Sequence, residues 1–244
     1  MQKRHEMINS EAMGRPVHMW CFGSFGLPVV VFPSAAGFAH EWDAQGMVDV
    51  LAPLINGGKI KLYCPESNVS QSWSGKGDPA ERVQQHMIYE LFVVKELVPW
   101  VRADCCSDNM QLAAVGCSLG GFFAANFALK YPEIFNYALC MSGRYQMINL
   151  MDGYSDTNVY FNNPLAYVAN LSGKHLARAQ TTHVNLVCGQ GAYEEGCIEE
   201  TIALGNLLDA KNIPNTVDIW GHDSKHDWLW WKRQASMHLN RQFG

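Results

Sequence analysis

Residues 111–130 read QLAAVGCSLGGFFAANFALK and contain the strongest indication of how the chain folds. Its first residues are apolar over the length of a buried strand, and those from Phe122 onward are apolar nearly all round, as in a buried helix. Between them, Gly116, Ser118 and Gly120 form a Gly-x-Ser-x-Gly motif. A tight turn between a strand and a helix lifts such a serine hydroxyl above the sheet, where it can act as a nucleophile. Ser118 is therefore the predicted catalytic nucleophile.

The motif on its own is a weak signal, because it fixes only three residues. A glycine-rich turn without a catalytic role would also satisfy it. The flanking strand and helix favour the catalytic interpretation, since a helix that starts at the turn directs the positive end of its dipole at the serine.

Apolar runs of strand length recur on both sides of this turn. Several are bounded by glycine or proline, and most are continuous, as is typical of parallel strands that are covered on both faces. The predicted strands are Pro28–Phe32, Lys59–Cys64, Met110–Gly116, Tyr137–Met141, His183–Cys188 and Thr216–Trp220.

Helical patterns separate these strands. Asp78 precedes Pro79, a favourable pair for a helix start, and the pattern continues to about Arg102, with Pro99 as a point where the helix kinks or ends. The other predicted helices are Ser118–Tyr131, Cys197–Lys211 and Trp228–Phe243. This alternation predicts an α/β fold with a mainly parallel sheet, right-handed crossovers and helices on both faces.

The chain is predicted to form a single domain over residues 1–244. Residues 143–176 break the alternation, because asparagine, aspartate and glycine are interleaved there with several tyrosines. We interpret this segment as an insertion over the active end of the sheet rather than as a second domain.

The composition argues against several classes of function. The formal net charge is −5 and no basic run occurs, which argues against nucleic-acid binding. The apolar runs fall far short of the roughly 18 residues that cross a bilayer, and the first residues lack the apolar core of a secretory signal. The eight cysteines match neither a disulfide framework nor a zinc pattern, which favours a reducing, cytoplasmic compartment. No metal ion or other cofactor is predicted, because the chain lacks the His-Glu-x-x-His motif of metalloproteases.

A serine hydroxyl needs a general base, and two histidines lie after the last predicted strand, where this arrangement places the base. Both belong to the stretch WGHDSKHDW at residues 220–228. His226 is the preferred base, because it lies directly before the final helix, from where a loop side chain can reach back over the sheet. His222 is the alternative. It lies closer to the strand and is expected to orient the loop.

The third member of such a triad is a carboxylate that accepts the imidazole N–H and fixes its tautomer. It is expected after the strand His183–Cys188, where the chain reads GQGAYEEG at residues 189–196. Glu194 and Glu195 are both candidates, and spacing does not separate them. Glu194 is the preferred acid, and Glu195 would then be a glutamate favoured by the dipole of the following helix.

Backbone N–H groups are expected to form an oxyanion hole for the charge that develops on the substrate oxygen. One donor is predicted at Leu119, the residue after the serine. The other is predicted in the loop after Phe32, with Ala35 as the first choice. Small residues in that loop, PSAAG at 33–37, let the backbone approach a substrate closely.

Together these motifs resemble the α/β-hydrolase family named "putative esterases", which includes esterase D, S-formylglutathione hydrolase and the mycolyltransferases. The resemblance covers nearly the whole chain and rests on PSAAG at 33–37, GCSLGG at 116–121, CGQG at 188–191 with Glu194, and HDW at 226–228 followed by Trp231. It implies the α/β-hydrolase fold and a triad of Ser118, Glu194 and His226. S-formylglutathione hydrolases would align their aspartate with Glu194, whereas the turn of the mycolyltransferases aligns better with Glu195.

Two features of the chain keep alternatives open within this resemblance. The loop after Phe32 has Pro33-Ser34 in place of the His-Gly pair that is common in esterases, which leaves the second oxyanion donor open. Trp73 lies in a segment that looks like the loop lining the acyl or alcohol pocket. It is equally compatible with packing and with substrate contact.

The sequence therefore predicts a serine esterase that cleaves a small-molecule carboxylic ester or thioester through an acyl-enzyme on Ser118. The alternatives are an acyltransferase that uses the same acyl-enzyme and a non-catalytic α/β-hydrolase relative that binds a ligand or partner. Neither the natural substrate nor the oligomeric state, a homo-oligomer included, follows from the sequence.

Overall fold

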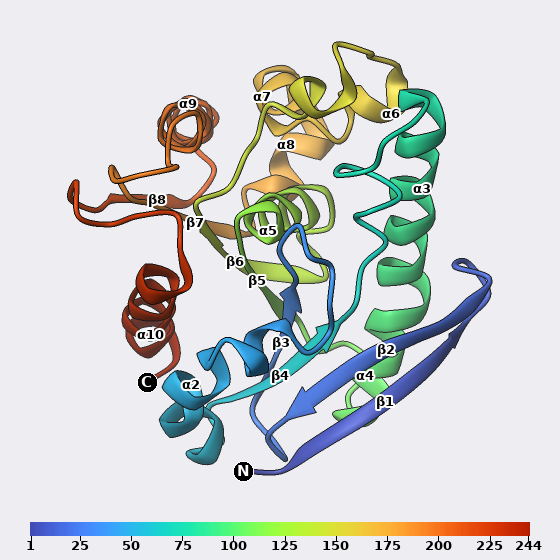
Figure 1. The fold of residues 1–244 in the computed structure, drawn as a ribbon, viewed down its shortest axis with the longest axis vertical. Coiled ribbons are helices and arrows are strands. Elements are labelled where there is room, and N and C mark those ends of the chain that lie inside the picture. Colours follow the sequence, from blue (N-terminus) through green and yellow to red (C-terminus); the bar gives the residue numbers. More distant parts are fainter.

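The computed structural model describes residues 1–244 and contains one sheet of eight strands, in the order β1-β2-β4-β3-β5-β6-β7-β8 (Figure 1). Neighbouring strands from β3 to β8 are parallel. Every predicted strand is present, with small shifts in its bounds: β3 (Leu27–Phe32), β4 (Ile60–Pro65), β5 (Leu112–Cys117), β6 (Phe135–Met141), β7 (His183–Cys188) and β8 (Asn215–Ile219). Because these strands are parallel, their carboxyl ends lie on the same side of the sheet. The loops that follow Phe32, Cys117, Cys188 and Ile219 all begin there.

The sheet also contains an antiparallel hairpin that the sequence analysis missed. β1 (Lys3–Ser10) pairs with β2 (Arg15–Phe22), and β2 pairs in turn with β4. In β2, the buried residues Val17, Met19 and Cys21 alternate with more exposed ones, which is the period-2 signal of a strand. The many polar residues of β1 give little such signal. The sheet is therefore mainly parallel, as predicted, with an antiparallel edge.

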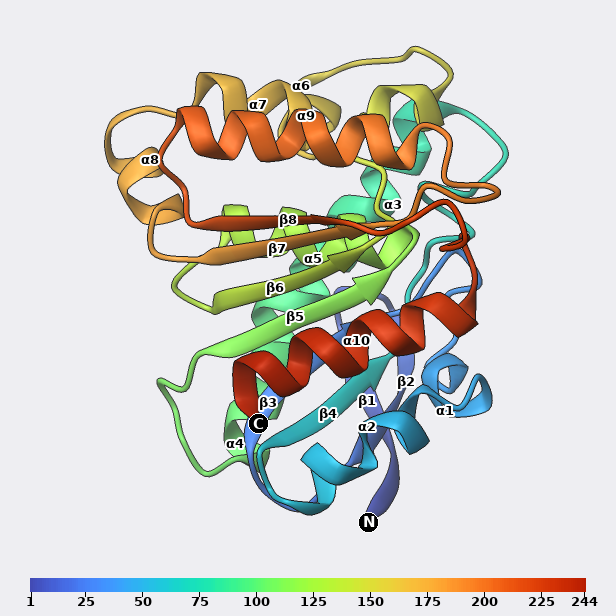
Figure 2. The same cartoon turned by 90° about the vertical axis from the view of Figure 1, so that its left-hand side faces the viewer.

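Helices cover both faces of the sheet, as predicted (Figure 2). The helices over one face are α2 (Met47–Asn56) and α10 (Trp228–Phe243), and those over the other are α3 (Pro79–Phe92), α5 (Leu119–Lys130) and α9 (Cys197–Ala210). Within β3, Val29 and Val31 belong to the core beneath α10, whereas Val30 and Phe32 belong to the core beneath α5. A strand that supplies two cores must be apolar at every position, which explains the continuous apolar run in the sequence.

The helix predicted from Asp78 continues to Asp104, and its geometry changes near its proline. Asp78 caps it, because the side chain accepts a hydrogen bond from the Ala80 N–H at 2.7 Å. α3 passes into a π-helical turn, η1 (Val93–Leu97), and then into α4 (Val98–Asp104), which contains Pro99. Proline has no N–H for the regular helical hydrogen bond. The wider π-helical turn before it lets the helix continue past the proline without that bond.

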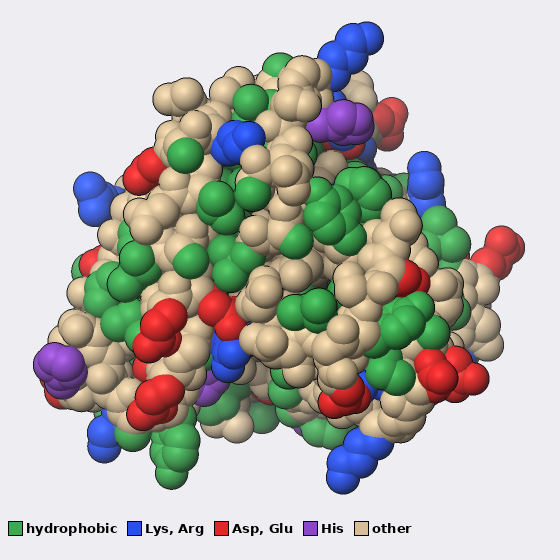
Figure 3. Space-filling model, turned by 90° about the horizontal axis from the view of Figure 1, so that it is seen from above, with side chains coloured by type: hydrophobic (Ala, Val, Ile, Leu, Met, Phe, Trp, Pro, Cys, Tyr) green, Lys and Arg blue, Asp and Glu red, His purple; other side chains and the backbone are tan.

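Residues 143–176 connect β6 to β7 mainly through short helical turns. They are η2 (Met147–Met151), α6 (Thr157–Tyr160), α7 (Pro164–Tyr167), η3 (Val168–Asn170) and the start of α8 (Gly173–Ala179). α6 contacts α3, α7 contacts α9 and α8 contacts α5, so the segment extends the helical layer on the α5 side of the sheet. Figure 3, a view from above this layer, shows hydrophobic side chains that reach the surface there.

None of the helices combines the length and the apolar composition that a membrane span requires. All eight cysteines are free thiols. Most of them are buried, as is usual for cysteines that serve as small apolar residues.

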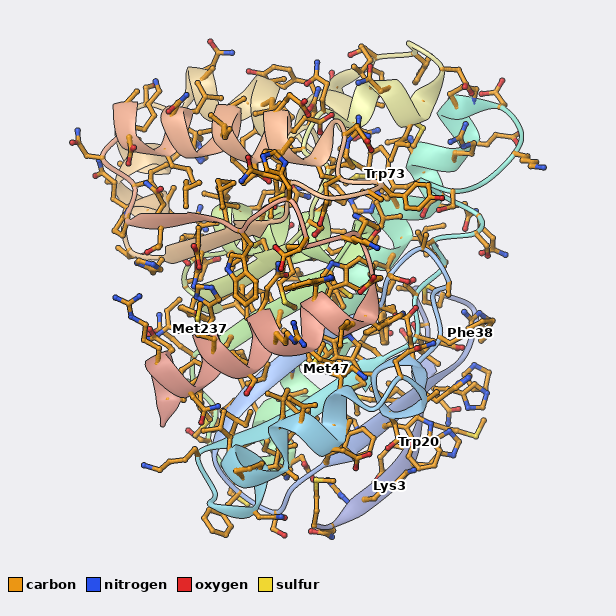
Figure 4. All side chains as sticks on the ribbon, turned by 60° about the vertical axis from the view of Figure 1, so that its left-hand side comes forward. Lys3, Trp20, Phe38, Met47, Trp73 and Met237 are labelled. Carbon is orange, nitrogen blue, oxygen red and sulfur yellow. The ribbon has the colours of Figure 1, made fainter.

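A buried polar network ties the segment of α6 to α3. His86, on α3, is fully buried, and its Nδ1 lies 3.0 Å from the Nε1 of Trp73, while its Nε2 lies 2.9 Å from the Oδ1 of Asn162. Trp73 is labelled in Figure 4. An indole N–H can only donate, so Nδ1 accepts and Nε2 carries the proton. Trp73 is 1% exposed, which settles its role as packing rather than substrate contact.

This network is expected to make the protein less stable in mild acid. Burial lowers the pKa of His86 to about 4, whereas an unfolded histidine titrates near pH 6.5. Between these pH values the His86 imidazole is protonated in the unfolded chain but not in the folded chain. The free energy of unfolding therefore falls as the pH falls through this window. The full loss is about 3 kcal/mol. Urea unfolding at a series of pH values measures it.

The variant His86→Gln is the control for this prediction. It retains a polar side chain on α3 but cannot titrate, so its stability should depend less on pH between 4 and 6.5 than that of the wild type. Parallel pH curves for the two proteins would show that His86 is not the group responsible.

Candidate active site

Ser118 occupies the turn between β5 and α5 in a strained backbone conformation, with φ 55° and ψ −125°. The flanking glycines allow the turn to close. A Cβ at Gly116 would lie 2.3 Å from the carbonyl carbon of Gly120, and a Cβ at Gly120 would lie 2.3 Å from the carbonyl oxygen of Phe32. No larger residue fits at either position, so the glycine spacing in the sequence and the tightness of the turn have the same cause.

His226 lies in the loop between β8 and α10, and its Nε2 is 2.9 Å from the Oγ of Ser118. The next residue, Asp227, caps α10 by accepting hydrogen bonds from two N–H groups of the first turn. This cap fixes the direction of the chain immediately after the histidine. The indole of Trp231 meets the imidazole edge to face, with ring centroids 4.8 Å apart.

Glu194 lies in the turn after β7, and its Oε2 is 3.1 Å from the Nδ1 of His226. The carboxylate is buried, and its Oε1 accepts a hydrogen bond from the Ser142 hydroxyl at 2.6 Å. An ionised carboxylate can only accept, so the imidazole proton facing it resides on Nδ1. The lone pair of Nε2 is then directed at the hydroxyl of Ser118.

The two alternative residues lie outside this group. Glu195 is exposed, and His222 is exposed with its Nδ1 3.4 Å from the carbonyl oxygen of Gln190. Tyr193 has φ 67°, a left-handed conformation that turns the chain just before Glu194. The structure therefore brings the preferred acid and base together with the serine and leaves their neighbours in solvent.

Two backbone N–H groups near Ser118 are available to a substrate oxygen. Leu119 is the first residue of α5, so its N–H has no partner within the helix. The N–H of Ala35, in the loop after β3, has no acceptor within the protein. A Cβ at Gly120 would lie 2.9 Å from the carbonyl oxygen of Pro33, which shows how closely this loop approaches the start of α5. These are the two residues predicted as oxyanion donors.

Glu41, at the start of α1 (Glu41–Ala44), holds the loop of Ala35 and was missed in the sequence. Its buried carboxylate accepts hydrogen bonds from the N–H of Ser34, at 2.7 Å, and from the Ser34 hydroxyl. The N–H of Gly37 donates to the Ser34 carbonyl at 3.1 Å. With these neighbouring groups occupied, the N–H of Ala35 is left free. The signal in the sequence was a carboxylate shortly after the loop, in an otherwise mostly uncharged stretch.

Two buried thiols adjoin the histidine and the carboxylate. The Sγ of Cys197 lies 3.9 Å from the Nδ1 of His226, and the Sγ of Cys188 lies 3.5 Å from the Oε2 of Glu194. Burial raises the pKa of Cys197 to about 12, so this thiol stays protonated near neutral pH.

Glu194, Cys197 and His226 are also the one group of His, Cys and carboxylate side chains whose donor atoms lie close enough together to hold a metal ion, within 4.8 Å of one another. Two of these atoms are already joined by the hydrogen bond of 3.1 Å between Nδ1 and Oε2. That contact is the arrangement of an acid–base pair.

One cavity of the molecule lies away from Ser118. It has a volume of about 440 Å³ and is bounded by the carboxyl end of α5, at Lys130, and by residues of α6 to α8. Ser118 precedes the opposite end of α5, and a helix of this length spans about 18 Å. The hydrogen bonds around Ser118, rather than cavity volume, therefore mark the candidate active site.

Comparison with known proteins identifies the family. Residues 12–240 match the family model described as "Putative esterase". The diacylglycerol acyltransferase/mycolyltransferase Ag85C of Mycobacterium leprae is 25% identical to the chain over 208 residues, which cover 72% of this chain and 62% of that protein. The chain thus spans less than two thirds of the length of this relative.

Solved structures share the fold. A ferulic acid esterase has a TM-score of 0.78 at 18% identity, with 99% of this chain and 98% of that chain covered. The S-formylglutathione hydrolase of Agrobacterium tumefaciens has a TM-score of 0.76 at 12% identity, covering 99% and 95%. That of Staphylococcus aureus has a TM-score of 0.72 at 14% identity, covering 100% and 97%. The predicted α/β-hydrolase fold is confirmed, and because the family model matches residues 12–240, the chain belongs to the "Putative esterase" family.

Proposed function

We propose that the protein is a serine esterase that hydrolyses a small-molecule carboxylic ester or thioester through an acyl-enzyme on Ser118. One observation carries the proposal: Ser118, His226 and Glu194 are linked in series by contacts of 2.9 and 3.1 Å. Family membership supports the reaction class. The structural relatives include enzymes named for ferulic acid esters and for S-formylglutathione, which is consistent with either kind of ester.

In the acylation step, the Nε2 of His226 takes the proton of Ser118 while the Oγ attacks the acyl carbon. The π electrons of the carbonyl move onto its oxygen, and the N–H groups of Leu119 and Ala35 donate hydrogen bonds to this oxyanion. Glu194 stays ionised and stabilises the imidazolium. When the tetrahedral intermediate collapses, the alcohol or thiol leaves with the proton from His226, and the acyl group remains on Ser118.

In the deacylation step, water replaces the alcohol. His226 accepts a proton from the water while its oxygen attacks the acyl carbon. The second intermediate collapses, the proton returns to the Oγ of Ser118, and the carboxylic acid leaves.

An alcohol acceptor in place of water would give a new ester, which is the acyltransferase alternative. The mycobacterial relative is named as an acyltransferase, which supports this alternative. Adding a primary alcohol to the assay and measuring the ratio of ester to acid distinguishes the two reactions.

A series of p-nitrophenyl esters of increasing acyl length, assayed with the wild type and Ser118→Ala, tests the proposal. Labelling with a fluorophosphonate probe adds a readout that does not depend on the choice of substrate, because labelling requires an activated serine. We expect the wild type to be labelled and the variant not. A wild type that resists labelling would favour a non-catalytic binding protein.

Glu194→Gln is expected to lower kcat by about 10⁴-fold, as does loss of the triad acid in a serine protease. The amide carries no charge to stabilise the imidazolium, and its NH₂ group can reverse the hydrogen bond to Nδ1. The ring then loses the tautomer in which Nε2 faces Ser118 as an acceptor. Steady-state kinetics with the best ester of the series measures the effect.

Glu195→Gln is the matched control, since it makes the same change one residue further along, at an exposed position. We expect nearly unchanged kinetics and a stability cost of at most about 1 kcal/mol from the lost interaction with the helix dipole. A severe defect in Glu195→Gln together with a mild defect in Glu194→Gln would assign the role of the triad acid to Glu195. Mild defects in both would leave the proposed triad without its acid.

A further inference from the structure

Ser142, which follows β6, carries a hydroxyl in a place where the backbone would favour glycine. It is fully buried and has a left-handed conformation, with φ 50°. Its N–H donates to the carbonyl of Val187 at 2.7 Å, so the chain is still paired with β7 at this point. The strain of a side chain at positive φ suggests that the hydroxyl has a specific task.

The direction of the hydrogen bonds at this hydroxyl follows from the chemistry of its partners. The Nε1 of Trp231 lies 3.0 Å from the Oγ of Ser142, and an indole N–H can only donate. The Oγ therefore accepts from Trp231, and its own hydrogen is directed at the Oε1 of Glu194, 2.6 Å away. All three side chains are more than nine-tenths buried, an environment in which a hydrogen bond to a carboxylate is strong.

The two oxygens of the Glu194 carboxylate have separate partners. Ser142 and, at 3.4 Å, the N–H of Gly189 approach Oε1. His226 and, at 3.5 Å, the thiol of Cys188 approach Oε2. A bond on Oε1 fixes the rotation of the carboxylate and thereby sets where Oε2 points.

We propose that Ser142 and Trp231 are positioning residues, whose chain of hydrogen bonds holds the Glu194 carboxylate with Oε2 toward the Nδ1 of His226. The inference rests on the proposed function, because it assigns them a role within the proposed esterase machinery. Ser142 acts through Glu194. Trp231 acts through Ser142 and through its edge-to-face contact with the imidazole.

Loss of the Ser142 hydroxyl should shift the pH dependence of activity in a defined direction. The hydroxyl holds the Glu194 carboxylate with Oε2 toward the imidazole. Without it, the carboxylate can rotate away from Nδ1 and stabilises the imidazolium of His226 less, so the base stays unprotonated, and activity persists, down to a lower pH. Loss of a residue that merely supported the fold would lower stability and leave the acid limb of the pH profile in place.

The other titratable groups that face this pair do not account for such a shift. From β7 and α9 they are the thiols of Cys188 and Cys197, and burial raises the pKa of both. From the loop after β6 it is Arg144, which is paired with Glu200 at 2.6 Å. α10 contributes the uncharged Trp231.

Ser142→Gly tests the inference, because glycine relieves the backbone strain and removes only the hydroxymethyl group. We expect kcat/KM to fall by about 10- to 100-fold, the range for a lost hydrogen bond to a charged group. KM should be nearly unchanged, the Tm unchanged or higher, and the acid limb of the pH profile displaced to lower pH. Trp231→Phe keeps a ring and should cost less, about 3- to 10-fold. In the double variant that cost should shrink, because the indole has lost its acceptor.

Ser224→Ala is the matched control. Ser224 is also fully buried near the site, but its hydroxyl contacts Gln234 and not the proposed triad, so the variant should keep wild-type kinetics. Wild-type kinetics in Ser142→Gly, or a loss of activity without a shifted acid limb, would overturn the inference. So would loss of the fold in both Ser142→Gly and Ser142→Ala, because the hydroxyl would then serve folding.

Ser118→Ala, assayed in parallel, separates this inference from the proposed function. If Ser118→Ala remains active, the proposed function itself fails. If Ser118→Ala is inactive while Ser142→Gly behaves as the wild type, only the positioning role fails.

Discussion

Replacing Ser118 with alanine is expected to lower ester hydrolysis by about four to six orders of magnitude in kcat and to leave the fold intact. The change removes the atom on which the acyl group forms, so only the oxyanion donors and substrate binding remain to accelerate the reaction. Alanine is as compatible with the turn as serine, because both carry one Cβ at φ 55°. Steady-state kinetics, supported by thermal unfolding, measures both parts of the expectation.

Cys117→Ala is the control that lies nearest in sequence. Cys117 is fully buried in the core beneath α10, and burial raises the pKa of its thiol, so it offers no competing nucleophile. We expect this variant to lose some stability and to keep its kcat. Near wild-type turnover in purified Ser118→Ala, free of contaminating esterase, would show that Ser118 is not the nucleophile.

Replacing His226 with alanine is expected to have an effect of similar size, because the serine then has no base and the leaving group has no acid. The imidazole is the only group within hydrogen-bond distance of the Oγ of Ser118, at 2.9 Å. The kcat of the variant and its rate of fluorophosphonate labelling should fall together, since both depend on an activated hydroxyl.

His222→Ala provides the comparison within the same loop. His222 is exposed, and the hydrogen bond of its side chain to the carbonyl oxygen of Gln190 is long, at 3.4 Å. We expect this variant to keep its kcat and to lose at most a little order in the loop. An inactive His222→Ala together with an active His226→Ala would assign the base to the other histidine.

Much of the candidate site could be predicted because it depends on local constraints. The turn at Ser118 needs glycine on both sides for steric reasons, so the motif and the geometry are inseparable. The preference for His226 followed from its place before the final helix, and the structure adds Asp227 as the cap that fixes this place.

The remainder depends on contacts between distant segments, which no local pattern encodes. Glu194 rather than Glu195 contacts His226, and the chain turns just before it at Tyr193, whose left-handed conformation the residue type does not indicate. The contacts of Glu41 with Ser34 and of Ser142 with Trp231 join residues that come together only in the folded sheet. The hairpin of β1 and β2 was missed because β1 is largely polar and packs along one edge.

The parallel sheet also sets the order in which the site can be completed as the chain is synthesised. The loop of Ala35 follows β3, Ser118 follows β5 and Glu194 follows β7, but His226, the proposed base, follows β8, the last strand of the sheet. Until the segment after β8 has been synthesised and has folded, Ser118 therefore lacks its proposed base. The proposed ester hydrolysis becomes possible only after β8 has joined the sheet, so activity would report that the parallel strands β3 to β8 have formed.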